Sequence, residues 1–335
     1  MIYLPLRFDW VAVPHGLPCR SASRVFVYSF DAGSWFRLFS LENDRRRELK
    51  LLRFGPKGQE KPGIMDADGI VRDLSSVIAD ITPAQLSPAA LQKLRAIDPG
   101  SLPPVPDPGR IGTPFTGLGK FMCVGLNYTD HAIESKQPIP TEPILFNKWT
   151  NALTGPNDPV VMPRNSVKTD WEVELGVVIG SKARYVSMES ALSYVAGYTV
   201  VNDVSERAYQ LERGGTWDKG KGCDTFGPVG PWLVTTDEIT DPQNLRLWLD
   251  VNGHRWQDGK TQTMIFNVAF LIHYISQFAT LYPGDLISTG TPPGVGMGVQ
   301  PEPVYLKAGD VMRLGIDGLG EQQQTVHEWN DALIG

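Results

Sequence analysis

Apolar and charged residues alternate in the stretch "TDWEVELGVVIG", which spans residues 169–180. Asp170, Glu172 and Glu174 occupy every second position there, before the sequence becomes apolar. Successive side chains of a strand point to opposite faces, so the three acids are expected to share one face. Like charges repel unless a cation lies between them, so this face is either solvated or holds a metal.

Apolar runs elsewhere in residues 106–335 predict many short strands and few helices. Strands are predicted at residues 121–126, 170–180, 196–204, 229–235, 245–253 and 285–290. Helices are predicted at residues 187–195 and 267–281, and another begins near Thr129. Because helices do not follow each strand, the pattern favours a mixed or antiparallel β-rich domain over a doubly wound sheet. The predicted fold class is therefore α+β.

Residues 49–105 are predicted to form a smaller α/β domain. Short apolar runs separated by Gly, Pro and Asp-Gly in residues 51–76 are typical of strands joined by tight turns. The stretch "SPAALQKLRAI" predicts a short helix with Ser87 as N-cap and Pro88 at its first position. The Pro-rich "DPGSLPPVPDPGR" predicts a linker. Residues 1–48 show no clear amphipathic period and are expected to be a weakly ordered extension or, alternatively, a short hairpin.

Composition narrows the classes of partner. The 335 residues are 41% hydrophobic and 20% charged, which is typical of a soluble globular protein. The net charge of -6, with no basic cluster beyond "DRRRELK", argues against a nucleic-acid partner. No apolar run approaches the roughly 18 residues that span a bilayer, so no membrane partner is expected. Three cysteines without a CxxC motif fit a protein of the reducing cytoplasm.

The alternating acids are candidate metal ligands. Glu172 and Glu174 can reach one cation from the same strand face, and Asp203 in "TVVNDVSER" ends another apolar strand. Three carboxylates with water make an all-oxygen site, which suits Mg²⁺ or Mn²⁺ better than zinc. From these residues alone, a solvated acidic face is the alternative.

His131 is a candidate general base because of its context. It lies in "GLNYTDHAIES", at the start of a predicted helix, and Glu134 follows three residues later on the same helix face. A histidine oriented by a carboxylate can take a proton from water near neutral pH. A helix-capping histidine with a surface partner is the alternative.

Two Gly-rich stretches are candidate anion-binding loops. The segment after Asp203 carries Arg207, Gln210, Lys219 and Lys221 within eighteen residues. The segment "STGTPPGVGMG" offers hydroxyls and exposed backbone amides after a strand, and such loops can bind a carboxylate. Each stretch taken alone could simply be a loop.

Six segments together resemble the fumarylacetoacetate hydrolase family, in the order that this family has. They cover about residues 115–300 and read "VGLNYTDHAIES", "PILFNKWTNALTGPNDPVVMP", "DWEVELGVVIG", "GYTVVNDVSERAYQ", "KGKGCDTFGPVGPWLVT" and "PGDLISTGTPPGVGMG". The resemblance implies a β-rich catalytic domain, a mixed β-sandwich or roll, over residues 106–335. It also implies a small N-terminal α/β domain over residues 49–105.

The resemblance also implies roles for individual residues. The family's metal carboxylates correspond to Glu172, Glu174 and Asp203. Its catalytic residues correspond to His131, Glu134 and a loop lysine, which is Lys221 with Lys219 as the rival. Its substrate-binding residues correspond to Arg207, Gln210, Thr291 (with Thr289 nearby) and Tyr128. Gly125 to Tyr128 offer no fourth acid, so three protein carboxylates and more water are expected around Mg²⁺ or Mn²⁺.

Two stretches, "LLRFGPKGQEKPG" and "QLERGGTWDKGKGCDTFGP", resemble the bacterial sugar-acid members of the family. This implies a hydrolase of carbon–carbon bonds that cleaves a 2,4-diketo acid, namely 2,4-diketo-3-deoxy-L-rhamnonate or the L-fuconate derivative. The products would be pyruvate and a hydroxy acid such as lactate. Decarboxylation or isomerisation of a 2-oxo acid, or a ureidoglycolate lyase-type reaction, is the alternative at the same site. The resemblance further implies a homodimer.

Two further expectations concern single positions. Members that resemble this chain begin with Met just before "KLLRFG", where this sequence has Leu49. Residues 1–48 are therefore hypothesised to precede the native start, with intact mass of the native protein as the test. Asp170 has no family role and is expected near the rim of the site, orienting Lys168 or a metal-bound water.

Overall fold

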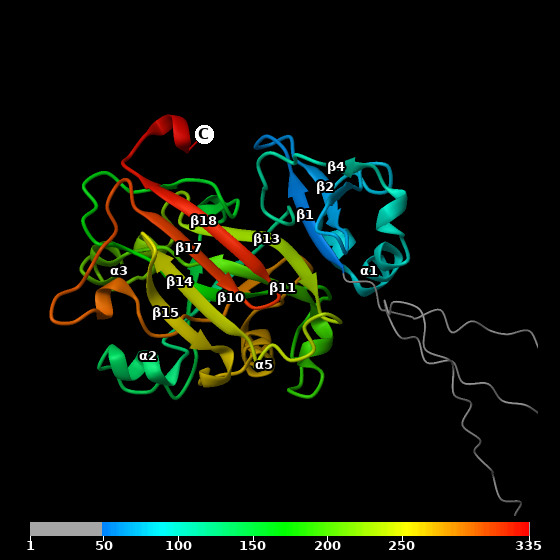
Figure 1. Ribbon diagram of the computed structural model, residues 1–335. Helices are drawn as coiled ribbons and strands as arrows, with labels where there is room; N and C mark the ends of the chain where they lie inside the picture. Colours follow the sequence, from blue (N-terminus) through cyan, green and yellow to red (C-terminus); the bar gives the residue numbers. More distant parts are fainter. Residues whose placement is uncertain (1–48, 335) are drawn as a thin grey trace, which may run out of the picture. The chain divides into compact units, whose positions relative to one another are not determined.

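The computed structural model describes residues 49–334 (Figure 1). The expectations for residues 1–48 lie outside the described residues. Described residues at the N-terminal side form four short strands, one α-helix and two 3₁₀ turns. These are β1 (Lys50–Phe54), β2 (Lys61–Met65), β3 (Val71–Asp73), η1 (Pro83–Leu86), α1 (Pro88–Arg95), η2 (Pro99–Ser101) and β4 (Pro104–Val105). Ser87 caps α1 by accepting a hydrogen bond from the amide of Ala90, as expected from the sequence.

The main sheet continues these strands into the rest of the chain. Within the described residues its order is β4-β3-β2-β1-β13-β11-β10-β16-β5-β6, with β7 paired to β13. The added strands are β5 (Phe121–Gly125), β6 (Ile144–Lys148), β7 (Leu153–Thr154), β10 (Val173–Ile179), β11 (Val195–Asn202), β13 (Gly227–Thr235) and β16 (Leu286–Ser288). Pairing is antiparallel except for β16 with β5 and β13 with β7, so the sheet is mixed. Because β1 pairs with β13, strands β1 to β4 extend this same sheet.

A second sheet packs on the central strands of the first (Figure 1). Its order in the described chain is β15-β14-β17-β18-β8. Its strands are β8 (Val160–Val161), β14 (Arg246–Val251), β15 (His254–Lys260), β17 (Val311–Ile316) and β18 (Gly320–His327). A short ladder joins β9 (Thr169–Asp170) to β12 (Ser205–Glu206). The β-rich, mixed architecture predicted from the sequence is thus confirmed.

The two faces of β10 explain where the site can form. Leu175 and Val177 belong to the core cluster that the two sheets share with Leu249 and Leu314. Val178 faces the other way, into a cluster with the apolar side of α1. Glu174 shares the parity of Val178 along the strand, so its side chain points away from the second sheet.

The few helices are short. They are α2 (Thr129–Glu134), α3 (Arg207–Leu211), α4 (Asp218–Lys221) and α5 (Val268–Phe278), and the remaining 3₁₀ turns are η3 (Thr150–Ala152), η4 (Ala191–Tyr194), η5 (Thr261–Thr263), η6 (Gly296–Gly298) and η7 (Asp331–Leu333). The helix expected at residues 267–281 is confirmed as α5. The helix expected at residues 187–195 is wrong: only η4 forms, because Val195 already enters β11. No helix in residues 49–334 is long and apolar enough to cross a membrane.

Polar strands were missed by the pattern of apolar runs. In β18, Gln322 and Gln324 lie on the inward face and are buried. Their amide groups donate to backbone carbonyls, including those of Val200 and Gly230, so their burial leaves no unpaired donor. Buried and exposed positions do alternate along β18, but glutamines occupy the buried positions where apolar residues are usual.

Candidate active site and metal centre

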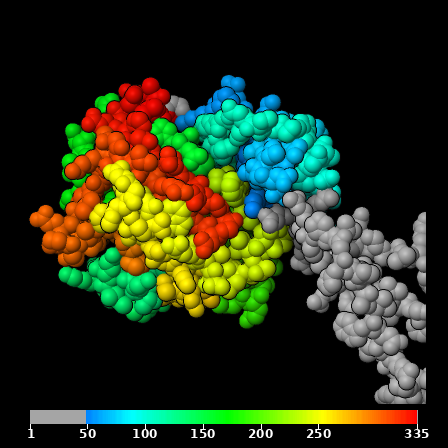
Figure 2. Space-filling view, in the orientation of Figure 1, coloured from blue at the N-terminus to red at the C-terminus, as the bar shows by residue number. Residues whose placement is uncertain are grey.

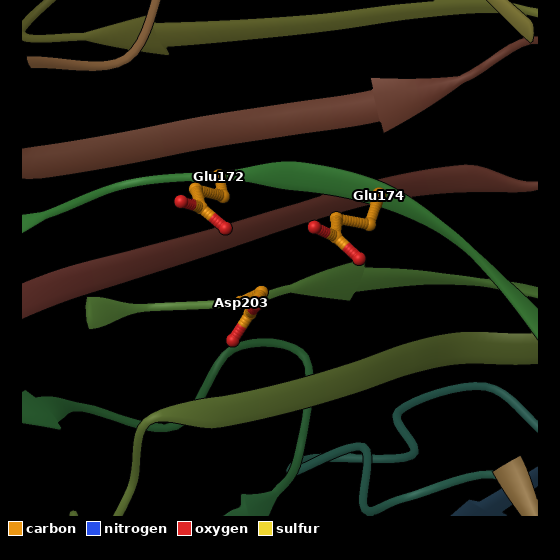
Figure 3. Close-up of side chains that lie close together, drawn as sticks. All are labelled: Glu172, Glu174 and Asp203. Carbon is orange, nitrogen blue, oxygen red and sulfur yellow. The ribbon is translucent and has the colours of Figure 1, made fainter. Parts of the chain in front are cut away.

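Three carboxylates converge on the face of the main sheet that lies away from the second sheet (Figure 3). Glu172 directly precedes β10, Glu174 lies within it, and Asp203 follows β11. The antiparallel pairing of β10 and β11 places them side by side, and the amide of Asp203 donates to the carbonyl of Glu172 at 2.9 Å. One oxygen from each carboxylate lies within 4.8 Å of the others, and all three residues are buried. This is the group of candidate metal ligands expected from the sequence.

Three buried cations surround these acids. The Lys221 amine lies 2.6 Å from Glu172 and 2.7 Å from Asp203. Lys148 lies 2.5 Å from the other oxygen of Asp203, and Arg207 lies 2.7 Å from Glu172. Glu174 forms no salt bridge with any residue in the described part of the chain.

This asymmetry appears in the pKa values of the acids. Burial raises the pKa of Glu172, but the charges of Lys221 and Arg207 outweigh it and lower the pKa to about 2. Burial, followed by the charges of Asp203 and Glu172, raises the pKa of Glu174 well above its usual range. No cation therefore pairs directly with the ionised Glu174 carboxylate in the described chain, and the nearby charge of Lys221 lowers its pKa by less than burial and the two neighbouring acids raise it. A divalent cation shared with Glu172 and Asp203 would supply a compensating positive charge, so the donor set fits a hard metal ion such as Mg²⁺ or Mn²⁺.

The loop "STGTPPGVGMG" binds carboxylates of the protein itself. The hydroxyl of Ser288 and the amide of Gly290 donate to Glu174 at 2.6 and 2.9 Å. The amide of Gly294 donates to Glu134 at 2.9 Å. Gly294 has a φ of +103°, and a Cβ there would lie 1.9 Å from the carbonyl oxygen of Trp256, so glycine is needed for this close approach. The sequence indicated an anion-binding loop without identifying which anions it binds.

Asp170 is placed differently from the expectation. It is fully buried and accepts hydrogen bonds from the backbone amides of Gly296 and Met297, at 2.7 and 3.0 Å. Asp170 also accepts from the amide of Trp171 and from the Nε of Arg207, each at 2.8 Å. Lys168 pairs with Glu212 instead. The predicted place at the rim is therefore wrong, because Arg207 and the two amides offer the acid a buried, fully paired position.

His131 and Glu134 form the expected pair on α2. The His131 Nδ1 lies 3.0 Å from a Glu134 oxygen, and the other Glu134 oxygen accepts from Gly294. This contact joins α2 to residues 290–298, and the two segments lie side by side at one edge of the molecule (Figures 1 and 2). With Nδ1 engaged by Glu134, Nε2 is the nitrogen left to accept a proton in the cavity that His131 lines.

A cavity of about 300 Å³ unites most of the candidate residues. Its lining includes His131, Glu172, Glu174, Arg207, Gln210, Lys221 and Thr291. Asp203 and Glu134 lie directly behind this lining, in contact with Lys221 and His131. Thr291 donates its hydroxyl to the carbonyl of Val173 and accepts from Gln257.

Three candidates lie outside this lining. Tyr128 is fully buried in the core cluster and does not line the cavity, so its role in substrate binding stays a prediction. Lys219 is exposed and donates to the carbonyl of Arg213, which leaves Lys221 as the loop lysine at the site. Thr289 donates to the carbonyl of Leu175, and Thr291 is the threonine that lines the cavity.

Lys148 was missed by sequence reasoning. It ends β6 and is buried with its amine against Asp203 and the carbonyls of Val204 and Lys221. A signal existed, because Lys148 shares one face of the strand with Ile144 and Phe146, and that face is otherwise apolar. A lysine at such a position needs a buried partner.

Comparison with known proteins establishes the family. Residues 120–327 match the family described as fumarylacetoacetate (FAA) hydrolase C-terminal. A protein of Burkholderia ambifaria, whose name gives only a provisional hydrolase assignment, is 62% identical over 277 residues. The match covers 83% of this chain and 98% of that protein. The chain belongs to the fumarylacetoacetate hydrolase family. The family expected from the sequence is thus confirmed, and the nearer resemblance to sugar-acid hydrolases stays a prediction.

Solved structures of the fumarylacetoacetate hydrolase family share the fold. The fumarylacetoacetate hydrolase of Exiguobacterium antarcticum is 33% identical, with a TM-score of 0.75, over 84% of this chain and 100% of its own. The 2-hydroxyhepta-2,4-diene-1,7-dioate isomerase of Mycobacterium marinum is 32% identical, with a TM-score of 0.66 and the same coverage. The maleylpyruvate hydrolase of Sphingobium sp. SYK-6, solved with manganese(II) and pyruvate, is 29% identical, with a TM-score of 0.70 and again the same coverage. Structures similar to this chain are thus named as hydrolases and as isomerases.

Proposed function

We propose that the protein is a divalent-metal-dependent hydrolase that cleaves the C3–C4 bond of a 2,4-diketo acid and releases pyruvate. The observation that carries the proposal is the convergence of Glu172, Glu174 and the His131–Glu134 pair on one cavity. The sequence resemblance favours 2,4-diketo-3-deoxy-L-rhamnonate or its L-fuconate counterpart as the substrate. The manganese and pyruvate of the maleylpyruvate hydrolase structure support a metal and a 2-oxo acid at the corresponding site.

The floor of the cavity would receive the 2-oxo acid end of the substrate. Glu172, Glu174 and Asp203 would hold a divalent cation, which supplies a Lewis acid for the hard carboxylate and keto oxygens of the substrate. Arg207 and Lys221 are buried beside these ligands and would add charge-assisted hydrogen bonds to the substrate.

His131 would act as the general base. Its Nε2 takes a proton from water as the water oxygen bonds to C4, and Glu134 stabilises the protonated ring through Nδ1. The C3–C4 bond then breaks, and its electron pair passes to C3 and the adjoining 2-oxo group. The proton held by His131 returns to C3, which gives pyruvate and a carboxylic acid. The sum is one diketo acid and one water converted to two products.

Turnover of defined substrates tests this proposal. The full chain is incubated with 2,4-diketo-3-deoxy-L-rhamnonate and with its L-fuconate counterpart in Mg²⁺ or Mn²⁺, and pyruvate and lactate are quantified by chromatography. Equimolar pyruvate and lactate are expected, and EDTA should abolish their formation. Absence of pyruvate from every 2,4-diketo acid in both metals would refute the proposal.

Isomerisation is the second candidate, because one similar structure is named as an isomerase. A base such as His131, placed beside a site that binds a 2-oxo acid, can also move a proton between carbon atoms of that substrate without cleaving it. Proton exchange at C3 in deuterated water, without pyruvate release, would favour this reaction. Release of CO₂ from oxaloacetate would instead favour decarboxylation.

We further propose that the protein is a homodimer, as the sequence resemblance implies, and that it is cytoplasmic, as the cysteine usage indicates. Light scattering of the purified chain tests the dimer, and a single-chain mass at micromolar concentration would contradict it. Fractionation of the native host tests the location.

A further inference from the structure

The cavity has two chemically different ends. The residues that carry charge, namely Glu172, Glu174, Arg207 and Lys221, are all buried. Many of the other lining residues are apolar, and several of these are partly exposed. The apolar wall comprises Leu126, Ile144, Phe146, Leu211, Trp217 and Met297.

Ring contacts order these two ends along the cavity. The Lys221 amine lies 5.0 Å from the centre of the Phe146 ring. Phe146 contacts Trp217, with ring centres 5.3 Å apart, and Trp217 packs against Gly125, where a Cβ would lie 2.3 Å from its ring. The aromatic wall therefore leads outward from the charged floor, and Leu211, 47% exposed, lies at the mouth.

The mouth offers a substrate no free cation among the described lining residues. The two lining cations, Arg207 and Lys221, are committed to Asp170, Glu172 and Asp203 at the floor. Two further polar lining residues are neutral: Ser135, whose hydroxyl is buried without a hydrogen-bond partner among the described residues, and Gln137, which is exposed. Lys136 stands between these two in the sequence but does not line the cavity.

We infer that the substrate tail beyond C4 is short, neutral and largely apolar, with room for a hydroxyl group, and that a tail ending in a second carboxylate is rejected. The inference rests on the proposed function, because it assumes that the 2-oxo acid end occupies the floor. A carboxylate against the apolar wall would lose hydration without gaining a cationic partner, which is costly. A tail of one hydroxyl and one methyl group, as in a 6-deoxy sugar acid, meets both the apolar wall and the neutral polar groups.

Binding of two matched 2-oxo acids tests the inference without turnover. The probes are 2-oxohexanoate and 2-oxoadipate, which have the same number of carbons and differ by the terminal carboxylate. Isothermal titration of the full chain in Mg²⁺ is expected to give a Kd roughly tenfold or more lower for 2-oxohexanoate. Equal affinities, or tighter binding of 2-oxoadipate, would overturn the inference.

Cleavage of two matched diketo acids separates this inference from the proposed function. The pair is 2,4-dioxoheptanoate and 2,4-dioxoheptanedioate, with pyruvate release as the readout. A higher kcat/KM for the monoacid supports both statements. Cleavage with preference for the diacid overturns the inference and leaves the proposed function standing. Failure to cleave either compound counts against the proposed function, and the binding ratio then decides the inference.

Substitutions at the mouth test whether residues there set the preference for 2-oxohexanoate over 2-oxoadipate. Leu211→Arg supplies a cation there and is expected to narrow the ratio of the two Kd values roughly tenfold, by tightening 2-oxoadipate binding. Leu192→Arg is the matched control, because Leu192 is 41% exposed but lies outside the cavity lining, and it should leave the ratio unchanged. Lys136→Ala should also leave the ratio unchanged. Loss of 2-oxoadipate binding in that variant would identify Lys136 as a carboxylate receptor and contradict the inference.

Discussion

Two clusters of acids and bases in this protein, one half-buried and one fully buried, differ in how their carboxylates are paired. In the Arg110 cluster, Arg110 lies 2.7 Å from both Glu60 and Asp158, and Arg53 lies 2.7 Å from Asp80. Every one of these carboxylates has an arginine partner. In the site cluster, Glu172 and Asp203 have cationic partners, whereas Glu174 has only the hydrogen bonds of Ser288 and Gly290.

The pKa values follow this difference in pairing. Burial alone would raise the pKa of Asp158, but hydrogen bonds from Arg110 and Thr154 and the charge of Arg110 lower it below its usual value. The pKa of Glu174 is raised instead, because burial and two neighbouring carboxylates act on it together. The carboxylates of the Arg110 cluster are all paired within the protein, whereas the site cluster would be completed by a bound cation.

Removing the charge of Glu174 gives the largest expected effect. Glu174→Gln keeps an acceptor for Ser288 and Gly290 but removes one of the three metal carboxylates. Activity should fall roughly 10³-fold or more, because Lewis-acid chemistry needs the metal. In EDTA the variant should have a higher Tm than the wild type, because a carboxylate whose pKa is raised by folding destabilises the fold when ionised at neutral pH.

Three measurements on Glu174→Gln check this prediction: turnover, Mg²⁺ binding by titration, and Tm with EDTA. If the variant has a lower Tm than the wild type in EDTA, the ionised Glu174 carboxylate is already compensated in the metal-free protein. The contrast between the two clusters would then be lost.

His131→Ala comes next in size. Loss of the general base should reduce kcat by roughly 10²–10⁴-fold. Mg²⁺ affinity should stay near the wild-type value, because His131 is not among the three candidate ligands. The variant therefore separates the base from the metal, and unchanged turnover would remove His131 from the mechanism.

The sequence allowed the core of the site to be predicted because each signal was local. Glu172 and Glu174 are two residues apart on one strand, and His131 and Glu134 share a single helical turn. Strand parity and helix spacing place such pairs without knowledge of the tertiary fold. Asp203, thirty-one residues from Glu172, was a candidate from its place at the end of an apolar strand, and the resemblance to the family supported its grouping with the two glutamates.

Features set by tertiary contacts were not predicted. Asp170 looked like a third acid of the same strand face. Its distant partners are Arg207 and the amides of Gly296 and Met297, and the two amides lie more than a hundred residues away in the sequence. Lys148 lies fifty-five residues before Asp203, and no spacing rule joins them. Position along a strand gives the direction of a side chain but not the group that it meets.

Lys148→Met tests whether a cation can complete the site cluster. The side chains of Lys148 and Asp203 are fully buried, so loss of the lysine leaves Asp203 short of positive charge. Destabilisation of about 3–5 kcal/mol is expected in EDTA. Saturating Mg²⁺ should restore more stability to the variant than it adds to the wild type, because the metal compensates the same carboxylate. Equal gains in Tm would contradict this coupling. Lys219→Met, at an exposed lysine of α4, serves as the control.

Asp158→Asn tests the Arg110 cluster and has the smallest expected effect. Asparagine can still accept from Thr154 and Gly155, but it loses the charge that faces Arg110. The free energy of unfolding should fall by about 2 kcal/mol at neutral pH, while kcat and metal affinity stay unchanged. A carboxyl with a pKa lowered by folding stabilises the protein above its unfolded pKa of about 4, and this contribution is lost as the pH falls toward the folded value. The difference in Tm between wild type and variant should therefore shrink on acidification.

Asp258→Asn is the matched control. The Arg246–Asp258 pair is also bidentate but is exposed, and exposed ion pairs contribute little to stability. A Tm loss as large for Asp258→Asn as for Asp158→Asn would show that burial does not distinguish the Arg110 cluster from a surface ion pair.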